Sequence, residues 1–336
     1  MTKQPMVTVI ILNWQQPLLT LELLADLERL DYANYRVVVV DNGSRDNSKS
    51  LLLDYIGHQS QLAKNGRLEL MPLAHNIGFA EGNNRAVERY LKQSDYCLFL
   101  NNDTRVEPNL LTALLEAFED HAESKTAMVS PLIHDLPEGA KPNRKLPIWF
   151  AGGNFNFGRG GAQQSTEPSS WQTVYPTHFL SGCALLVSRS IIELVNSTYT
   201  DGPQSKKSTG GLVFFDPDFF AYNEDADLCY RLQQLDYQLL VTPKTRAYHR
   251  LAGSSGGPKS ANFWYYNVRN NWLMVSRYAT NLEKLLFWLY FWGYKPVLLS
   301  ILGALLRPRS DKPLRLRAIW QGWQDYRHQR FGVRQL

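Results

Sequence analysis

The fold of this chain is indicated most clearly by a run that joins an apolar strand to a polar turn, Val37-Val38-Val39-Val40-Asp41-Asn42-Gly43-Ser44. A continuous β-branched run is typical of a strand that is buried on both faces of a sheet. The polar residues that follow mark the carboxyl end of that strand, and Ser44 begins a group of helix-capping residues. The run therefore predicts a strand followed by a helix, which is the repeating unit of parallel sheets.

The same alternation recurs along the first part of the chain. Further apolar, β-rich runs lie at residues 7–12, 68–73 and 96–100, and a short one begins at Met128. Apolar residues at helical spacing follow at 17–27, 79–93 and 108–121. Strands that alternate with helices predict an α/β fold with a doubly wound, mainly parallel sheet. Residues 131–176 are rich in Pro, Gly, Asn and Ser, so we expect a loop-rich excursion there.

The composition is that of a globular protein. Of the 336 residues, 44% are hydrophobic and 20% are charged, which argues against a disordered chain. The three cysteines, Cys97, Cys183 and Cys229, are far apart in apolar segments. We therefore expect buried thiols in a reducing compartment, not a disulfide framework or a zinc site. The start of the chain has no signal-peptide pattern, so we expect the catalytic part to be cytoplasmic.

The C-terminal part differs in kind. Residues 285–306 carry a single charge, Lys295, and about 20 apolar residues are enough to cross a bilayer. However, Gly293 and Pro296 interrupt the stretch, aromatic residues such as Trp288 lie within it, and the net charge of +5 is concentrated in the basic tail after it. These features are typical of helices that lie in the membrane interface and bind anionic lipid.

We therefore expect a catalytic domain at residues 1–260 and a helical, membrane-interfacial region at residues 261–336. The protein would then be associated peripherally with the inner face of the plasma membrane. Two alternatives fit the same composition: a helical pair that packs on the domain or on a partner, and a true membrane span. No nucleic-acid partner is expected.

Polar clusters follow the predicted strands at the point where each strand ends. They are Asn13-Trp14, the run from Asp41 to Ser44, His75-Asn76-Ile77-Gly78 and Asn101-Asn102-Asp103, and a fifth cluster, Asn223-Glu224-Asp225, follows much later. In an open α/β sheet, ligands bind outside the carboxyl ends of the strands. The clusters therefore predict one site, suited to a nucleotide-linked and metal-bound substrate.

Two residues are candidate metal ligands. Asp103 directly follows a buried strand, and a carboxylate there can bind Mg²⁺ or Mn²⁺ together with the phosphates of a nucleotide. His249 precedes a Gly/Ser loop at 253–256 and can act as a neutral imidazole ligand. Arg246 and Arg250 could balance diphosphate charge. The alternatives are a solvated turn at Asp103 and a structural histidine.

Two further segments are candidates for binding a nucleotide. Asp41 can accept the N3–H of a uracil or thymine ring, or else cap the next helix. In the segment from Asn76 to Asn84, Gly78 lets the backbone approach a ligand, and a helix that begins at Phe79 favours negative charge nearby. A simple helix-capping turn is the alternative. The chain contains neither the glycine fingerprint of dinucleotide binding nor a P-loop.

Glu224, Asp225 and Asp227 open a predicted helix and supply a candidate general base. A sugar hydroxyl is a poor nucleophile while it is protonated, so its attack requires a base. Crowding of these acids with Asp218 could raise a pKa by repulsion between like charges. The alternative is that they are N-terminal helix acids favoured by the helix dipole.

Together these residues resemble glycosyltransferase family 2, which has the GT-A fold. The resemblance covers roughly residues 7–256 and rests on motifs that occur in the family's order. These are 40–44, 76–84, 100–104, 179–187, 219–231 and 249–256. The closest subgroup is bacterial rhamnosyltransferase-like enzymes of polysaccharide and O-antigen assembly. One departure is that Asn101 replaces the first Asp of the D-x-D motif, so metal binding would depend more on Asp103 and the donor diphosphate.

The resemblance implies a role for each candidate residue. Asp225 would be the catalytic base, with Glu224 as a weaker candidate, and Asp103 and His249 would bind Mg²⁺ or Mn²⁺. The residues implied in binding the nucleotide sugar are Asn13, Asp41, Asn76, Gly78, Asn84, Asn101 and Asn102. The implied activity is inverting, metal-dependent sugar transfer from a UDP- or dTDP-sugar, such as dTDP-rhamnose, to a saccharide or polyprenyl-linked saccharide acceptor.

Two other functions fit parts of the pattern. A nucleotidyltransferase would usually have a Gly-rich, basic loop after the first strand, and Asn13-Trp14-Gln15-Gln16 is neither. A catalytically inactive sugar-nucleotide binder that acts as a scaffold at the membrane would not need both carboxylate sites. A dehydrogenase is disfavoured because the dinucleotide fingerprint is missing.

Overall fold

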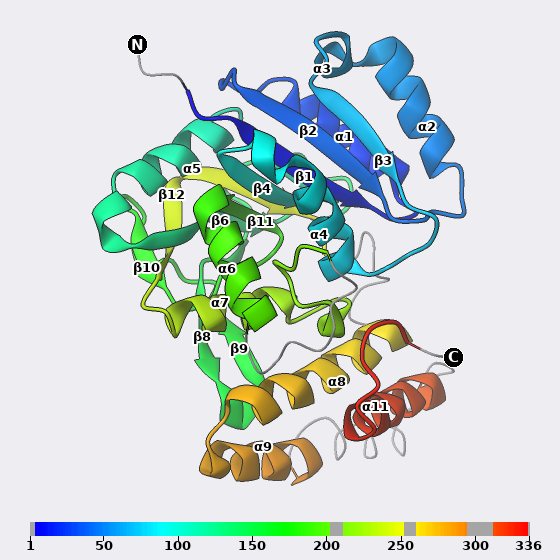
Figure 1. Cartoon of the computed structure of the whole chain (residues 1–336), viewed down its shortest axis with the longest axis vertical. Helices are drawn as coiled ribbons and strands as arrows, with labels where there is room; N and C mark the ends of the chain where they lie inside the picture. Colours follow the sequence, from blue (N-terminus) through cyan, green and yellow to red (C-terminus); the bar gives the residue numbers. More distant parts are fainter. Residues whose placement is uncertain (1–3, 202–210, 252–259, 294–311, 335–336) are drawn as a thin grey trace.

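The computed structural model describes residues 4–201, 211–251, 260–293 and 312–334. In this part of the chain a large sheet has the strand order β10-β12-β6-β11-β4-β1-β2-β3, and a layer of helices lies below it in Figure 1. The strands are β1 (Val7–Asn13), β2 (Tyr35–Asp41), β3 (Leu68–Pro72), β4 (Tyr96–Asn101), β6 (Thr126–Asp135), β10 (Tyr175–Thr177), β11 (Ala184–Ser188) and β12 (Gln238–His249).

The half of the sheet formed by β3, β2, β1 and β4 is parallel. Leu12 in β1 lies beside both Val40 in β2 and Asn101 in β4, so the three strands end at the same level. The valines of β2 are fully buried from Val37 to Val40, as the continuous apolar run predicts. The prediction of an α/β fold with a mainly parallel sheet is therefore confirmed.

The other half of the sheet is mixed and brings a distant strand to the site. β11 is antiparallel to β4 and β6, whereas β12 is parallel to β6. A short strand, β5 (Thr104–Val106), pairs with the end of β12, so that His249 lies opposite Thr104. This pairing carries the end of β12 to the residues that follow β4.

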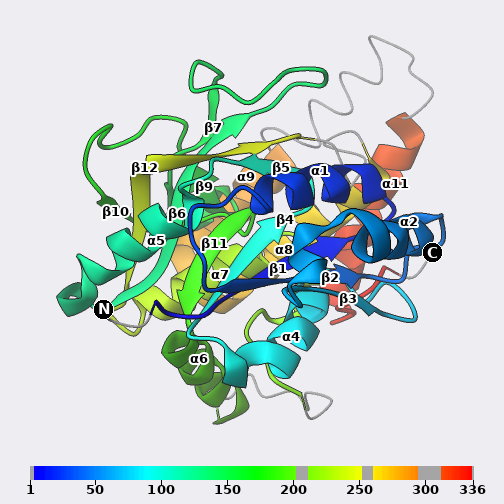
Figure 2. The same cartoon turned by 90° about the horizontal axis from the view of Figure 1, so that it is seen from above.

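Helices cover both faces of the sheet, as Figure 2 shows from above. They are α1 (Pro17–Leu27), α2 (Ser48–Asp54), α3 (Gln61–Lys64), α4 (Phe79–Tyr90), α5 (Leu110–Glu119), α6 (Arg189–Asp201) and α7 (Glu224–Gln233). α1 and α4 pack on opposite faces of β1 in this view. The helix predicted at 79–93 ends earlier as an α-helix, at Tyr90, and continues as one 3₁₀ turn at Leu91–Gln93.

The loop-rich excursion predicted at residues 131–176 contains short strands. β6 extends into it as far as Asp135, and β7 (Ile148–Phe150) pairs with the end of β6. A separate hairpin forms from β8 (Gly153–Asn156) and β9 (Gly161–Gln164). The excursion therefore places Trp149, at the centre of β7, beside His249, with 4.6 Å between the ring centroids.

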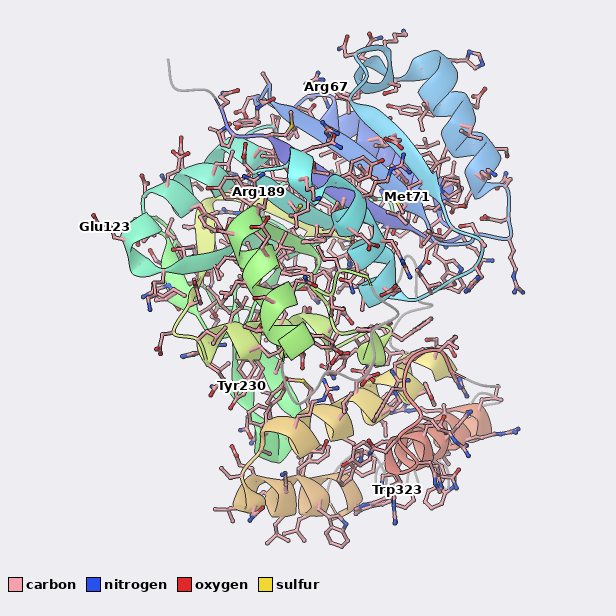
Figure 3. All side chains as sticks on the ribbon, in the orientation of Figure 1. Arg67, Met71, Glu123, Arg189, Tyr230 and Trp323 are labelled. Carbon is pink, nitrogen blue, oxygen red and sulfur yellow. The ribbon has the colours of Figure 1, made fainter. Side chains whose placement is uncertain are left out.

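The C-terminal region is helical, as predicted, and packs on the rest of the protein. It contains α8 (Ala261–Tyr278), α9 (Asn281–Gly293) and α11 (Lys312–Arg327). Met274, Phe287 and Ile319 from these helices join the same hydrophobic core as the sheet. Figure 3 shows Trp323 of α11 at the opposite end of the molecule from Arg67, which precedes β3. The division at residue 260 stays a prediction.

Among the helices that the structure describes, none combines the length and the apolar character that a membrane crossing requires. The second half of the apolar stretch at 285–306 lies outside the described residues, as does the Gly/Ser loop at 253–256.

Candidate functional site

The carboxyl ends of β1 and β2 form one side of the site. Asn13 and Asp41 are adjacent in the register, and Asn13 Nδ2 donates to Asp41 Oδ1 at 2.9 Å. Ser44 Oγ donates to the same oxygen, and Thr20 Oγ1 donates to Asn13 Oδ1 at 2.8 Å. These bonds fix the Asp41 carboxyl, which is 2% exposed, with Oδ1 engaged by protein groups. The role of Asp41 in binding a nucleotide base stays a prediction.

Asn42 joins this side to the loop before α4. Its Nδ2 donates to Asn76 Oδ1 and to the carbonyl of Gly78, both at 3.1 Å, and its Oδ1 accepts the Ile77 N–H. Gly78 has φ +94°, and a Cβ at this position would lie 2.6 Å from the Phe220 carbonyl oxygen. Only glycine fits such a close approach at this backbone angle. The requirement for Gly78 is therefore explained by protein packing.

The first N–H groups of α4 are used within the protein. Phe79 N and Ala80 N both donate to the Phe220 carbonyl, at 2.6 and 3.4 Å. The expected attraction of a ligand anion to this helix start is weakened, because these donors already have a partner. In the loop before this helix, Asn76 and Ile77 are partly accessible and Gly78 is buried.

Asn84 is held away from solvent by the backbone of a neighbouring segment. Its Nδ2 donates to the Phe215 carbonyl at 2.7 Å, and its Oδ1 accepts the N–H groups of Phe214 and Phe215. The side chain is 1% exposed. These hydrogen bonds are sufficient to explain why residue 84 is an asparagine. The role of Asn84 in binding the nucleotide sugar stays a prediction.

The residues after β4 form the centre of the site. Asn102 is buried and its Nδ2 donates to Thr20 Oγ1 at 3.2 Å, so it braces α1. Asn101 is partly accessible, and its backbone N–H donates to the Cys183 carbonyl at 2.9 Å. Asn101 is therefore the better placed of the two amides to contact a ligand.

Asp103 and His249 lie together, as two ligands of one cation would. Asp103 Oδ1 is 3.1 Å from His249 Nε2. Two ligands at about 2.1 Å from a cation and at right angles to each other lie about 3 Å apart. Asp103 Oδ1 and His249 Nδ1 are buried and have no hydrogen-bond partner among the described residues. The pair therefore fits a divalent cation.

Within the described ranges, three or more His, Cys, Asp or Glu side chains do not gather at any point to form a cage for a metal ion. A cation here would take its remaining ligands from water and phosphate, which is the usual arrangement for Mg²⁺.

The two arginines considered as diphosphate contacts are engaged elsewhere. Arg250 forms an ion pair with Glu22 at 2.7 Å. The Arg246 guanidinium is 5% exposed and donates to the Pro243 and Thr245 carbonyls. Arg250 would have to leave Glu22 in order to reach a phosphate, and Arg246 is a structural residue of β12.

The acidic motif starts α7 on the other side of the site. Asp225 is partly accessible, and its carboxylate accepts the N–H groups of Gly182 and Ala226, both at 2.8 Å. Burial raises the pKa of Asp225, and these hydrogen bonds oppose the shift. Burial, and then the charge of Asp225, raise the pKa of Glu224 well above its usual range. The pKa of Glu224 is raised more than that of Asp225, so Asp225 is the first of the two to lose its proton.

A buried thiol shows that the two carboxylate sites are close. Burial raises the pKa of Cys183 well above its ordinary value, and the charges of Asp103 and Asp225 add to the increase. Both carboxylates therefore lie within electrostatic reach of this one side chain. The structure thus brings together Asp103, His249 and Asp225, which are far apart in the sequence.

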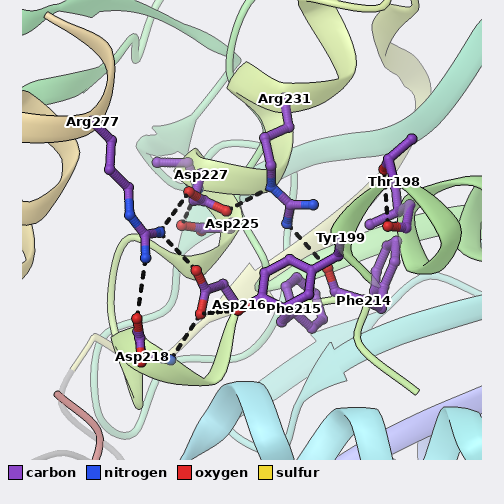
Figure 4. A network of polar contacts seen from close by, with 12 residues as sticks. Thr198, Tyr199, Phe214, Phe215, Asp216, Asp218, Asp225, Asp227, Arg231 and Arg277 are labelled. Carbon is purple, nitrogen blue, oxygen red and sulfur yellow. Dashed lines mark hydrogen bonds and ion pairs between the residues drawn. The ribbon is translucent and has the colours of Figure 1, made fainter. Parts of the chain in front are cut away.

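The charge of Asp227 adds to the raised pKa of Glu224, after burial and the charge of Asp225, as the predicted crowding of acids implies. Asp218 and Asp227 also belong to an ion-pair network (Figure 4). Arg277 of α8 contacts Asp216 Oδ2 at 2.6 Å, Asp218 Oδ2 at 3.2 Å and Asp227 Oδ1 at 3.3 Å. Arg231 also pairs with Asp227, at 2.8 Å. Burial opposes the charge of Arg277, but the carboxylates around it raise its pKa above the usual value.

Sequence reasoning missed Arg277 and Trp149, and it included Gly182 only as part of the motif at 179–187, without its hydrogen bond to Asp225. Each acts through a contact between segments that are distant in the chain, and no local pattern marks such a contact. A lone arginine within an aromatic helix is common in proteins and does not by itself indicate a site. The same holds for a tryptophan within a loop-rich stretch.

Comparison with known proteins adds the family. The family model described as glycosyl transferase family 2 matches residues 8–193. A similar curated protein is the N-acetylglucosaminyl-diphospho-decaprenol L-rhamnosyltransferase of Mycobacterium tuberculosis (strain H37Rv). It is 25% identical over 244 residues, which are 66% of this chain and 68% of the relative.

Solved glycosyltransferase structures share the fold. A crystal structure of GalNAc-T7 with UDP, GalNAc and Mn²⁺ matches 97% of this chain with a TM-score of 0.60 and 14% identity, and this chain spans 57% of it. The mannosyltransferase PcManGT from Pyrobaculum calidifontis, with GDP-Man and Mn²⁺, matches 98% with a TM-score of 0.53 and 16% identity, and 84% of that chain is covered. S. aureus TarS 1–349 matches 95%, with a TM-score of 0.52, 14% identity and 80% of its chain covered.

Proposed function

Because this chain belongs to glycosyl transferase family 2, we propose that it transfers a sugar from a nucleotide diphosphate donor to an acceptor hydroxyl with inversion at the anomeric carbon. The observation that carries the proposal is that Asp103, in contact with His249, and Asp225 both lie within electrostatic reach of Cys183. A leaving diphosphate needs its charge neutralised at one end of the reaction, and the attacking hydroxyl needs a base at the other.

Asp225 would act as the base. Its carboxylate takes the proton from the acceptor hydroxyl while that oxygen forms a bond to the anomeric carbon. The bond from the anomeric carbon to the diphosphate oxygen breaks, and its electron pair leaves with the nucleoside diphosphate. The N–H groups of Gly182 and Ala226 hold the carboxylate in place. Glu224, whose pKa is raised further, would keep its proton and supply a hydrogen bond.

Asp103 and His249 would hold Mg²⁺ or Mn²⁺, with Asn101 able to add its carbonyl oxygen. When bound, the cation neutralises the diphosphate as a Lewis acid. Trp149 packs against the His249 ring and restricts its orientation. Both GalNAc-T7 and PcManGT were solved with Mn²⁺, which supports a divalent cation in this fold.

The donor and acceptor follow from the relative and from the strand ends. Asp41, a carboxylate at the end of β2, suits a uracil or thymine ring, because it can accept the N3–H of either base. The name of the mycobacterial relative states an L-rhamnosyl transfer to a decaprenol-linked sugar. We therefore infer a UDP- or dTDP-sugar donor, with dTDP-rhamnose as the first candidate, and a saccharide or polyprenyl-linked saccharide acceptor in cell-surface polysaccharide synthesis.

A lipid-linked acceptor would place the enzyme at the inner face of the plasma membrane. One face of α9 is apolar and exposed, with Leu285 54%, Trp288 52% and Leu289 50% accessible. Trp320 of α11 is 49% exposed in the same helical layer. Such leucine and tryptophan side chains beside basic residues suit the interface of an anionic bilayer. We propose that this face rests on lipid.

A donor screen tests the function. Purified protein with Mn²⁺ or Mg²⁺ is offered UDP-, dTDP- and GDP-sugars, and released nucleoside diphosphate is measured with and without membrane lipid extract. Metal-dependent release from one donor, increased by lipid, supports the proposal and identifies the sugar. Tight donor binding without release under any condition would indicate a sugar-nucleotide-binding scaffold instead.

The membrane contact has its own test, which does not depend on activity. Flotation with vesicles that contain anionic lipid should recover the wild type, and Trp288→Gln together with Leu289→Gln should reduce recovery. Leu53→Gln, which changes an equally exposed leucine on α2, serves as the matched control. Equal flotation of all three proteins would contradict the membrane contact.

A further inference from the structure

The backbone just before α7 adopts a conformation that side chains rarely allow. Phe220 has φ +61° and ψ −59°, and Ala221 N donates to the Phe219 carbonyl at 2.7 Å. A positive φ at the central residue, with a hydrogen bond from the N–H of the third residue to the carbonyl of the first, defines the rare and strained form of the γ-turn. Tyr222 and Asn223 follow with φ +68° and +70°. Consecutive non-glycine residues in this region persist only where their surroundings hold them.

α8 supplies the groups that hold this turn. Asn270 is fully buried, and its side-chain amide faces three carbonyls of the turn. Asn270 Nδ2 donates to the carbonyls of Phe219 (3.0 Å), Ala221 (2.8 Å) and Tyr222 (2.6 Å). Arg269, also fully buried, orients the amide by donating from Nε to Asn270 Oδ1 at 2.9 Å. Buried donors and acceptors that are satisfied in this way rigidify a local structure.

The turn also reaches the donor side of the site. The Phe220 carbonyl accepts the N–H groups of Phe79 and Ala80 and lies against Gly78. The same turn leads directly into Glu224 and Asp225. One strained turn therefore fixes both the start of α4, after the candidate donor loop, and the start of α7, which carries the candidate base.

We propose that Asn270 is a positioning residue: it holds the Phe220 turn and thereby sets the placement of Asp225 relative to the donor loop. This inference deepens the proposed transferase function and rests on it for its catalytic part. It makes α8, which follows the predicted catalytic domain in sequence, a component of the catalytic apparatus. The side chain need not touch the substrate to act in this way.

The test compares two isosteric substitutions on one helix. Asn270→Asp keeps the volume and the oxygen that Arg269 contacts, but it replaces the donating amide nitrogen with an oxygen. Asn267→Asp makes the same change at a residue whose amide donates, among the described residues, to the Phe263 carbonyl within α8. If Asn270→Asp does not fold, Asn270→Ala removes the donor without adding charge.

Two readouts separate positioning from general destabilisation. Hydrogen exchange should accelerate in the peptides covering residues 76–84 and 219–228 in the Asn270 variant, and not in the Asn267 control. kcat per folded molecule should fall at least about tenfold, because small misplacements of reacting groups cost large factors. The acid limb of kcat/KM should move to higher pH, because a displaced Asp225 loses the Gly182 N–H bond that favours its charged form.

The outcomes discriminate between the two proposals. Two results overturn the positioning role. One is hydrogen exchange in the Asn270 variant that rises uniformly over the whole protein. The other is a normal kcat together with an acid limb of kcat/KM that does not move. If the wild type releases no nucleotide from any donor, the proposed function fails, and hydrogen exchange alone decides whether Asn270 holds the turn. Unchanged hydrogen exchange in the peptides covering residues 76–84 and 219–228 of the Asn270 variant would then show that Asn270 does not hold the turn.

Discussion

Asp103 Oδ1 lies 3.1 Å from His249 Nε2, although one residue follows β4 and the other ends β12. The antiparallel pairing of β5 with β12 produces this contact, because it sets His249 opposite Thr104. A carboxylate and an imidazole that converge in this way, with buried atoms that lack other partners in the described chain, are the basis of the metal site that we propose.

The metal site predicts a loss of cation dependence in Asp103→Asn. The substitution keeps the shape of the side chain but removes its charge. In the wild type, Mn²⁺ should strengthen nucleoside diphosphate binding by more than about tenfold. In Asp103→Asn it should no longer do so. Calorimetric titration with and without Mn²⁺ measures the difference. Asp54→Asn, the same change at an exposed residue of α2, should behave as the wild type. Equal Mn²⁺ dependence in both variants would reject Asp103 as a ligand.

The acidic pair predicts unequal roles for its two members. Asp225→Asn should lower kcat by about 10²–10⁴-fold, the usual contribution of a general base. Glu224→Gln should lower it far less, because glutamine resembles the protonated form that the raised pKa of Glu224 favours. Steady-state kinetics on the identified donor measures both. A larger loss in Glu224→Gln than in Asp225→Asn would exchange the two assignments.

The pH profile provides a separate test of Asp225. Burial raises the pKa of Asp225 above that of an ordinary aspartate, so the acid limb of kcat/KM should lie at higher pH than an ordinary aspartate would give. Activity should rise with pH through that limb, because the base acts only when it is deprotonated. A profile that is flat down to the ordinary aspartate range would argue against an essential buried carboxylate.

Glu224 should also affect stability as a function of pH. Its folded-state pKa lies above its unfolded value, so the folded protein binds more protons between these two values and stability falls as pH rises through that window. Glu224→Gln should flatten this dependence and stabilise the protein at neutral pH. Urea unfolding in EDTA measures it, and Glu116→Gln, an exposed change, is the control. A fall that persists in Glu224→Gln would contradict the assignment.

We expect a large loss of stability when Arg277 is removed. Arg277→Ala would leave the fully buried Asp216 and Asp227 without a cationic partner, although Arg231 still contacts Asp227. Breaking a buried pair costs about 3–5 kcal/mol of unfolding free energy. The exposed pair of Arg189 with Asp95 offers a matched control, because Arg189→Ala should cost about 1 kcal/mol or less. Denaturant unfolding should show this contrast, and similar losses would refute it.

Much of the fold could be read from local patterns. Val37 to Val40 specify a buried strand because a β-branched apolar run has few other stable positions in a sheet. The polar residues after such strands, Asp41 and Asn101 among them, converge because parallel strands end at one edge. The helical nature of the C-terminal region also followed from its composition.

The roles of individual asparagines could not be predicted in the same way. Asn84 stands within a motif typical of donor binding, yet its amide bonds the backbone of Phe214 and Phe215. Asn270 stands in no motif, yet it holds the turn before the acidic pair. In both cases the sequence shows only an asparagine within a helix. The hydrogen-bond partners that decide its role come from distant segments of the chain.

The sequence by itself therefore determined the alternating strands and helices of the first part of the chain and the edge of the sheet at which the polar clusters converge, because hydrophobic periodicity acts over a few residues. Only the tertiary structure decided that His249 reaches Asp103, that Arg277 neutralises Asp216 and Asp227, and that α8 holds the turn before Asp225. These contacts join segments that are far apart in the chain, and their energies depend on burial and distance, which exist only once the sheet and its helices have packed.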